Sequence, residues 1–289
     1  MSPARLRAPP PSRWNWGSPG VNFAGVSLAA AARPHPRSVL AVIPARLAST
    51  RLSRKPLRLL GGAPLVVRVL ERVRALALAD AVVVATDDPA VADVVERAGG
   101  TAALTSPDHP SGTDRIAEAV AAPSLAGYDI VLNVQGDEPF VDGATIRGAL
   151  GMVRDRGFPV GTVSAPAAED ALGSDAIVKV VTGDDGRALY FSRAPIPWCR
   201  DAADAARRAP LVRQHVGVYA YTREALARWV ALPEHPLERV ERLEQLRPLA
   251  AGLAIGVAPL DAPVAGGVDT EDDLARANAR WADLNDGRP

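Results

Sequence analysis

The sequence predicts an α/β fold built on a doubly wound, mostly parallel β-sheet. The first observation is that short apolar runs alternate with amphipathic segments of about 10 to 15 residues, an order typical of βαβ units. The second is that polar and charged loops follow the apolar runs, where the carboxyl ends of parallel strands bind ligands. The third is the length, because 289 residues can bury a large core.

The first half of the chain shows the clearer alternation. Residues 39–43 are an apolar run that we interpret as a buried strand ending at Pro44. Further strands are predicted at residues 81–85, 101–105 and 129–134. Helical spacing of apolar residues, with Pro89 opening one segment, predicts helices at residues 64–78, 89–98, 113–122 and 142–156.

In the second half of the chain, strands and helices alternate less regularly. Strands are predicted at residues 160–165, 177–182, 188–192, 215–221 and 254–258, with a hairpin turn at Asp184-Asp185-Gly186. Residues 201–209 are polar and Ala-rich, and we interpret them as a mobile loop. Helices are predicted at residues 222–230, 237–250 and 269–285. Within them, Glu238 and Arg242 have the spacing of an i, i+4 ion pair, and Thr270 is the expected N-cap ahead of Asp273.

The domain organisation follows from this pattern. Residues 1–38 contain no acidic residue and lack hydrophobic periodicity, so we interpret them as a disordered extension or the product of an upstream start codon. An Arg-rich transit peptide is the alternative. Residues 39–285 are interpreted as a single domain whose two halves, residues 39–158 and 159–285, share one sheet.

Composition excludes several classes of function. The formal net charge is zero, so a nucleic acid partner is not expected. The apolar runs are shorter than the roughly 18 residues of a membrane span, so membrane insertion is not expected either. Cys199 is the only cysteine of the sequence, which excludes an internal disulfide framework and a multi-cysteine metal site. The expected location is the reducing cytoplasm.

A basic loop follows the first predicted strand. It combines cations with hydroxyl side chains, namely Arg46, Ser49, Thr50, Arg51, Ser53, Arg54 and Lys55, and no acidic residue precedes Glu71. Such a loop at the carboxyl end of a strand suits an oligophosphate, although an Arg-rich surface loop is the alternative. Only Lys55 and Lys179 are lysines among 33 basic residues, so each of these ammonium groups is expected to meet a specific partner.

Two isolated aspartates on glycine-bordered loops are candidate metal ligands. Asp137 follows Gly136 at a strand end, and Asp269 follows Gly267 ahead of the last helix. Magnesium prefers one or two carboxylates together with phosphate oxygens and waters. The alternatives are a turn role for Asp137 and a helix-dipole role for Asp269.

A second polar set lies in the other half. Arg193, His215, Tyr219 and Tyr221 stand at or near strand ends, and the two tyrosines point to one face of their strand. They could recognise a carboxylated, polyhydroxylated ligand, or the tyrosines could pack in the core. A Ser-His-Asp arrangement with suitable surroundings is missing from the sequence, which favours catalysis by positioning and electrostatics over a covalent intermediate.

Taken together, these motifs resemble the CMP-Kdo synthetase family, the 3-deoxy-manno-octulosonate (Kdo) cytidylyltransferases. The resemblance covers residues 39 to about 282 and rests on segments in family order. They are I-P-A-R-x-x-S-T-R-L-x-x-K-P-L, V-A-T-D, D-H-x-S-G-T-x-R, N-V-Q-G-D-E-P, V-K-V-V, A-L-Y-F-S-R-A-x-I-P-W, H-x-G-x-Y-x-Y, L-E-Q-L-R and G-V-D-T-x-x-D-L.

The resemblance implies a nucleotidyltransferase-type fold with an inserted dimerisation and sugar-binding subregion. Residues 39–158 would then form the nucleotide-binding half, and residues 159–285 the sugar-binding and dimerisation half. The implied activity is the Mg²⁺-dependent transfer of CMP from CTP to Kdo, with release of pyrophosphate, for lipopolysaccharide biosynthesis. The implied assembly is a homodimer.

The resemblance also implies roles for individual residues. Catalysis would fall to Arg46, Lys55 and Asp137, and magnesium would bind Asp137 and Asp269. The implied nucleotide-binding residues are Arg46, Arg51, Lys55, Ser111, Gly112, Arg115 and Gln135. The implied sugar-binding residues are Arg193, His215, Tyr219, Glu244 and Gln245.

The chain departs from the family pattern at two places. The family pattern L-P-G-K-P is replaced by L-S-R-K-P, so Arg54 stands where a glycine would allow a positive φ. The pattern N-P-N-x-V-K reads S-D-A-I-V-K and ends at Lys179. Two alternative functions therefore stay open: activation of another acid sugar, such as 8-amino Kdo or a sialic acid, and a catalytically weakened nucleotide-binding homologue.

Overall fold

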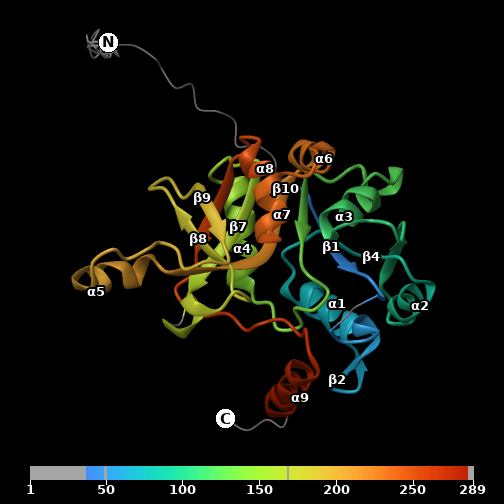
Figure 1. Ribbon diagram of the computed structural model, residues 1–289. Helices are drawn as coiled ribbons and strands as arrows, with labels where there is room; N and C mark the ends of the chain where they lie inside the picture. Colours follow the sequence, from blue (N-terminus) through green and yellow to red (C-terminus); the bar gives the residue numbers. More distant parts are fainter. Residues whose placement is uncertain (1–36, 49–50, 168, 286–289) are drawn as a thin grey trace, which may run out of the picture. The chain divides into compact units, whose positions relative to one another are not determined.

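The computed structural model describes residues 37–48, 51–167 and 169–285 (Figure 1). Its centre is a sheet in the strand order β11-β7-β10-β6-β1-β4-β5. The first-half strands are β1 (Val39–Ala45), β4 (Ala81–Thr86), β5 (Thr101–Leu104) and β6 (Ile130–Asn133). Neighbouring strands among these four are parallel, which confirms the predicted doubly wound α/β fold.

The second half extends the same sheet. Its strands are β7 (Val160–Pro166), β8 (Lys179–Thr182), β9 (Ala188–Ser192), β10 (Arg213–Thr222) and β11 (Ile255–Pro259). Strand β10 runs antiparallel to both β6 and β7, whereas β11 is parallel to β7. The β8–β9 hairpin branches from β10 at the pair Gln214–Lys179.

Helices cover both faces of the sheet. On one face lie α1 (Leu65–Leu76), α2 (Pro89–Arg97) and α4 (Gly143–Arg154); on the other lie α3 (Gly112–Val120), α6 (Arg223–Ala231) and α8 (Leu246–Ala250). In β1 the side chains of Val39, Ala41 and Ile43 face the first layer, and those of Leu40 and Val42 face the second. Because alternate side chains point to opposite faces, a continuous apolar run buries both.

The last helix contacts the short hairpin that follows the basic loop. Helix α9 (Glu271–Asn285) lies beside the hairpin of β2 (Leu59–Leu60) and β3 (Ala63–Pro64) (Figure 1). The side chain of Asn278 accepts a hydrogen bond from Gly61 N at 2.9 Å. Thr270 Oγ1 accepts from Asp273 N at 3.1 Å, and Asp273 Oδ2 accepts from Thr270 N at 2.9 Å, which confirms the predicted cap.

The structure differs from two predictions about single segments, one in the length of a strand and one in the type of structure. Strand β1 continues through Pro44 to Ala45, pairing with Ala85 and Thr86 of β4. Residues 201–209, predicted to be a loop, contain η4 (Ala202–Asp204), α5 (Ala205–Arg208) and the start of η5 (Ala209–Leu211). Alanine favours helix, and the Asp201 side chain caps the segment by accepting from Ala203 N at 2.9 Å.

The predicted helix at residues 237–250 is broken in two. Helix α7 (Pro236–Glu241) ends at Arg242, which has a left-handed φ of 54°, and α8 begins four residues later at Leu246. The predicted ion pair of Glu238 with Arg242 is therefore wrong. Glu238 instead binds Arg247 through two hydrogen bonds of 2.6 and 2.7 Å.

The remaining short helices are η1 (Lys55–Leu57), η2 (Pro123–Leu125) and η3 (Glu169–Gly173). Among the described residues, the helices are too short or too polar to cross a membrane. The disordered extension predicted for residues 1–38 lies outside the described residues, apart from Arg37 and Ser38. The predicted loop residues Ser49 and Thr50 also lie outside them.

Candidate active site

A cavity of about 360 Å³ opens at the carboxyl ends of β1 and β6. It lies where the strand order reverses, because β4 and β5 follow on one side of β1 and β6 on the other. The lining residues are Pro44, Ala45, Arg46, Arg51, Lys55, Pro56, His109, Pro110, Ser111, Gly112, Arg115, Gln135, Gly136, Asp137 and Asp269. The structure thus brings together all the predicted nucleotide-binding and metal-binding residues.

Lys55 joins three loops at the centre of this cavity. Its Nζ lies 2.5 Å from Asp137 Oδ2 and 2.9 Å from Asp269 Oδ1. The exposed Arg51 adds an ion pair with Asp269 at 3.1 Å. The basic loop, which has no acidic neighbour in sequence, therefore finds its counter-charges in tertiary structure. Arg54 does not appear among the described lining residues.

The charges in the cavity shift two pKa values. Burial disfavours the charged form of Lys55, but the attraction and hydrogen bonds of Asp137 and Asp269 outweigh it and raise the pKa of the lysine. Burial also raises the pKa of Glu138 to about 8, and the negative charges of Asp137 and Asp269 add to this shift. The protonated form of the Glu138 carboxyl is therefore favoured more than in an exposed glutamate.

Asp87 connects two segments of the chain that line the cavity. Its carboxylate accepts hydrogen bonds from Leu47 N and from the Arg115 guanidinium, both at 3.2 Å. Arg115 also donates to Thr105 Oγ1 at 2.6 Å and is only 3% exposed. Arg115 thus lines the cavity while anchoring the Ser111–Arg115 segment. The prediction of site residues missed Asp87, although V-A-T-D at a strand end was a signal for it.

Close backbone contacts hold the loops that carry the aspartates. A β-carbon on Gly136 would lie 2.7 Å from Pro44 O, so only glycine lets the two strand ends approach this closely. Val268 N donates to Asp137 O at 2.9 Å, which ties the loop before α9 to the loop after β6. The side chain of His109, also absent from the predicted site, lines the cavity and is hydrogen-bonded to the side chain of Glu118.

The predicted sugar-binding residues are not among the described residues that line this cavity. Tyr219 is 3% exposed and stacks on Tyr221 with ring centroids 5.7 Å apart, and both rings meet Trp229 edge-on. The tyrosines therefore point to one face, as predicted, and that face is core. His215 lies 3.0 Å from Thr162 Oγ1, and burial lowers its pKa to about 3.

Two of the other three members of this set, Arg193 and Glu244, are held by protein partners. The Arg193 guanidinium donates to the carbonyl oxygens of Asp175 and Glu241 at 2.6 and 2.8 Å. Glu244 accepts from Thr113 Oγ1 at 2.9 Å, and Gln245 is buried at the start of α8. Their assignment to sugar binding stays a prediction.

Comparison with known proteins agrees with this geometry. Residues 40–255 match the model of a family described as cytidylyltransferase. The chain belongs to the cytidylyltransferase family. It is 60% identical over 243 residues to a 3-deoxy-manno-octulosonate cytidylyltransferase of Gemmatimonas aurantiaca, covering 84% of this chain and 94% of that protein. It is 47% identical over 261 residues to the same-named protein of Rhodospirillum centenum, covering 88% and 97%.

Solved structures place the cytidylyltransferase chain in the same fold. One neighbour is a CMP:2-keto-3-deoxy-manno-octonic acid synthetase complexed with CTP, with a TM-score of 0.79 and 40% identity, covering 86% of this chain and 99% of that one. A 4-diphosphocytidyl-2C-methyl-D-erythritol synthase from Anaerococcus prevotii, with a TM-score of 0.57 and 14% identity, shares the fold alone.

Two carboxylates of this cytidylyltransferase have the chemistry of a magnesium site. The side chains of Asp137 and Asp269 are partly exposed, at 24% and 38%, and share the Lys55 ammonium at the cavity. Among the described residues, no group of three or more His, Cys, Asp or Glu side chains is placed to hold a metal by itself. Two aspartates fit an ion that completes its coordination with phosphate oxygens and water.

Proposed function

We propose that this cytidylyltransferase transfers CMP from CTP to Kdo, releasing pyrophosphate and giving CMP-Kdo for lipopolysaccharide biosynthesis. The observation that carries the proposal is the cavity in which Arg46, Arg51 and Lys55 face Asp137 and Asp269. The identity of 60% to a 3-deoxy-manno-octulosonate cytidylyltransferase supports Kdo as the acceptor.

In the proposed mechanism, the anomeric hydroxyl of Kdo attacks the α-phosphate of CTP in line, and pyrophosphate leaves. Arg46, Arg51 and Lys55 bind the triphosphate and stabilise the negative charge that develops on the leaving group. A magnesium ion held by Asp137 and Asp269 would supply Lewis-acid activation of the hydroxyl and partial neutralisation of the phosphate.

Lys55 can hold the nucleotide without releasing either aspartate. Its Nζ donates to both carboxylates, and the third N–H of the ammonium group is left for a phosphate oxygen. A single side chain thereby neutralises the aspartates before binding and the leaving group during reaction.

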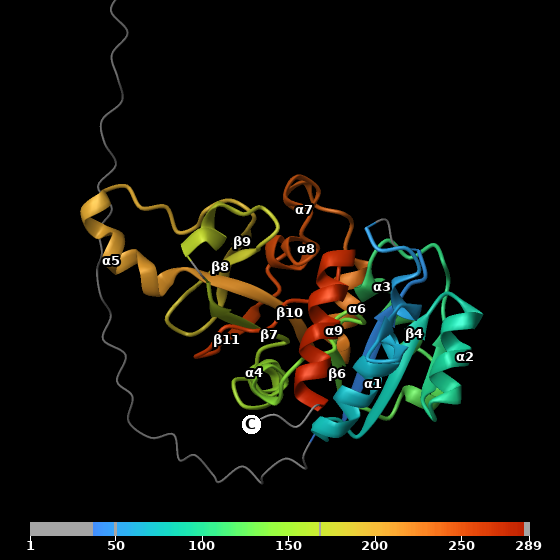
Figure 2. The same ribbon diagram turned by 90° about the horizontal axis from the view of Figure 1, so that it is seen from below.

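We also propose a cytoplasmic homodimer whose interface lies in residues 159–285. Leu189, Trp198 and Leu211 are 58–78% exposed. They belong to or adjoin the β8–β9 hairpin and the α5 segment, which lie on the side of the sheet away from α2 (Figures 1 and 2). Large exposed apolar side chains of this kind mark interaction surfaces. Light scattering at several protein concentrations tests the assembly, and a monomer throughout would reject it.

A pyrophosphate-release assay tests the proposed activity. The enzyme is incubated with CTP, Mg²⁺ and one acceptor at a time: Kdo, 8-amino Kdo or a sialic acid. Kdo is expected to give the highest kcat/KM. A higher value with another acceptor would reassign the sugar, and no release with any of them would favour a nucleotide-binding homologue without activity.

A further inference from the structure

The first turn of α3 forms one wall of the nucleotide cavity. Its residues Ser111 and Gly112 line the cavity. The Ser111 hydroxyl accepts from Asp114 N at 3.2 Å and donates to Asp114 Oδ2 at 2.6 Å, which fixes the start of the helix. A β-carbon on Gly112 would lie 3.4 Å from the Pro44 ring, so this turn packs closely against the end of β1. A small shift of the turn would therefore change the shape of the cavity.

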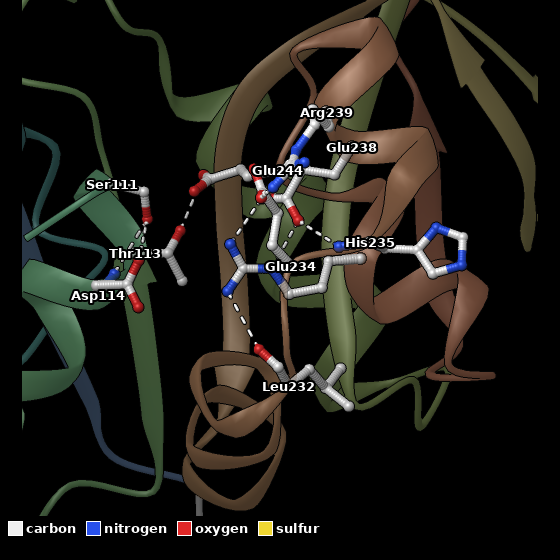
Figure 3. Close-up of polar contacts among 10 residues, drawn as sticks. Ser111, Thr113, Asp114, Leu232, Glu234, His235, Glu238, Arg239 and Glu244 are labelled. Carbon is white, nitrogen blue, oxygen red and sulfur yellow. Dashed lines mark hydrogen bonds and ion pairs between the residues drawn. The ribbon is translucent and has the colours of Figure 1, made fainter.

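The next residue of this turn, Thr113, is held from the second half of the chain. Thr113 is 1% exposed and does not appear among the described residues that line the cavity. Its hydroxyl donates to Glu244 Oε1 at 2.9 Å (Figure 3). Glu244 lies 131 positions away, on the turn between α7 and α8. This hydrogen bond therefore connects the wall of the nucleotide cavity to a distant segment.

The Glu244 carboxylate is poorly compensated for its burial. Its second oxygen, Oε2, is buried and has no hydrogen-bond partner in the described part of the chain. The nearby Arg247 directs its short hydrogen bonds to Glu238 instead. Burial raises the pKa of Glu244, and the hydrogen bond from Thr113 favours the charged form. An apolar side chain would avoid the cost of burying this carboxylate, so its presence indicates a role other than stability.

The turn that carries Glu244 is itself anchored. The Glu241 carboxylate accepts from Ser192 Oγ at 2.6 Å and from Arg193 N at 2.9 Å. In a continuous helix, residues 241 and 244 would lie on the same face. Arg242, with a left-handed φ of 54°, interrupts the helix between them. Glu241 therefore binds the end of β9 while Glu244 binds α3.

We propose that Thr113 and Glu244 are positioning residues for the nucleotide. Their hydrogen bond fixes the first turn of α3, and with it the cavity wall formed by Ser111 and Gly112. The proposal rests on the proposed function for the identity of the nucleotide, CTP. Removing the bond should weaken CTP binding even when no sugar acid is present. A direct electrostatic effect of Glu244 has the opposite sign, because removing a negative charge near a polyanion should strengthen its binding.

A double-mutant cycle tests the role of the hydrogen bond. CTP binding with MgCl₂ and no sugar acid is measured by calorimetry for the wild type, Thr113→Val, Glu244→Met and the double variant. We expect each single variant to bind CTP about 5-fold more weakly. The double variant should also lose about 5-fold rather than about 25-fold, because both changes remove the same bond.

Two further variants serve as controls. Thr113→Ser keeps the hydroxyl and should bind CTP within about 2-fold of the wild type. Thr145→Val makes the same change as Thr113→Val at a threonine that is 2% exposed in the first turn of α4. Thr145 does not appear among the described residues that line the nucleotide cavity, so CTP binding should not change.

Stability separates positioning from a merely structural role. Each single variant leaves one buried polar group without its partner, so urea should unfold it at a lower concentration than the wild type. The double variant removes both polar groups and should recover part of that loss. CTP binding should not recover with it. A double variant that binds CTP as tightly as the wild type would show that Thr113 and Glu244 act on stability alone.

The remaining outcomes are distinct from one another. Wild-type affinity or tighter binding in Glu244→Met, or losses that multiply in the double variant, would overturn the positioning role and leave the proposed function intact. No CTP binding by the wild type would overturn the proposed function first. If Thr113→Val does not fold, Glu244→Gln replaces it in the comparison, since its amide oxygen can still accept from Thr113. Glu244→Gln should then bind CTP more tightly than Glu244→Met, and equal losses in the two would contradict the proposal.

Discussion

Arg54 has a left-handed backbone conformation directly beside the lysine that bridges the two aspartates. Its φ and ψ are 51° and 39°, and it stands where the family pattern has glycine. Arg54 therefore takes the positive φ that a glycine would adopt more easily at this position. A non-glycine residue in this region costs about 1–2 kcal/mol, so the loop carries strain that its surroundings must hold.

Replacing Arg54 by glycine should relieve that strain. Because glycine loses more backbone entropy on folding, we expect a net rise of about 1 kcal/mol in the free energy of unfolding, measured by urea denaturation. Ser53→Gly is the matched control and should give no such rise, since Ser53 does not have a positive φ. An Arg54→Gly variant that is no more stable than the wild type would contradict this reading of the loop.

Asp137 is the residue on which the proposed metal chemistry depends most. Asp137→Ala should reduce pyrophosphate release by about 100-fold or more, because the phosphates lose a metal ligand. The fold should persist, since Lys55 keeps Asp269 as a partner at 2.9 Å. Pyrophosphate release and a thermal melt are measured together. Turnover near that of the wild type would remove Asp137 from the proposed metal site.

At the scale of single elements, the buried Lys179 of β8 connects two neighbouring segments of the chain. Strand β8 begins with Lys179, which is completely buried, and its Nζ donates to Ser174 O, Ile177 O and Arg193 O at 2.7, 2.7 and 2.5 Å. Burial lowers the pKa of this lysine. The specific partner expected for this lysine is thus the protein's own backbone. Lys179 joins the segment before β8 to the end of β9, which carries Arg193.

Removing this ammonium should loosen both segments. Lys179→Met leaves three buried carbonyls without their donor, and we expect the free energy of unfolding to fall by about 3 kcal/mol. Lys179→Arg should not restore it, because a planar guanidinium cannot direct three donors to the same point. Urea denaturation measures both variants. A Lys179→Met variant as stable as the wild type would show that the clamp is dispensable.

At the scale of the whole molecule, one sheet runs through both halves and buries titratable groups where they meet. His215 lies on β10, the strand that pairs with both β6 and β7. Burial lowers its pKa from 6.5 to about 3 in the folded protein. Below pH 6.5 the unfolded chain therefore binds a proton that the folded protein does not, and stability falls as the pH falls toward 3.

The pH dependence of the free energy of unfolding should reveal that His215 is neutral in the folded protein. The stability of the wild type relative to His215→Gln should shrink by about 1.4 kcal/mol between pH 7.5 and pH 5.5, following the titration of the unfolded chain. Urea denaturation at both pH values measures the difference, which cancels contributions common to the two proteins. A difference independent of pH would mean that His215 is not held neutral in the folded protein.

The sequence alone determined the order of strands and helices and the edge of the sheet that holds the cavity. Apolar periodicity is a local property of the sequence, so it predicts the strands directly. Because the carboxyl ends of parallel strands lie at one edge of the sheet, the sequence also placed Arg46, Lys55 and Asp137 together. The V-A-T-D segment carried a signal for Asp87, but nothing in its spacing named the partners Leu47 and Arg115.

Only the tertiary structure decided which groups pair. Lys55 binds Asp269 across 214 positions, and no local pattern specifies a partner so distant. Arg242 ends α7 with a left-handed φ, and Glu238 pairs with Arg247, because packing against the rest of the fold outweighs helix periodicity. Burial likewise decided that Tyr219 faces the core, since alternation along a strand fixes the face of a side chain but not what covers that face.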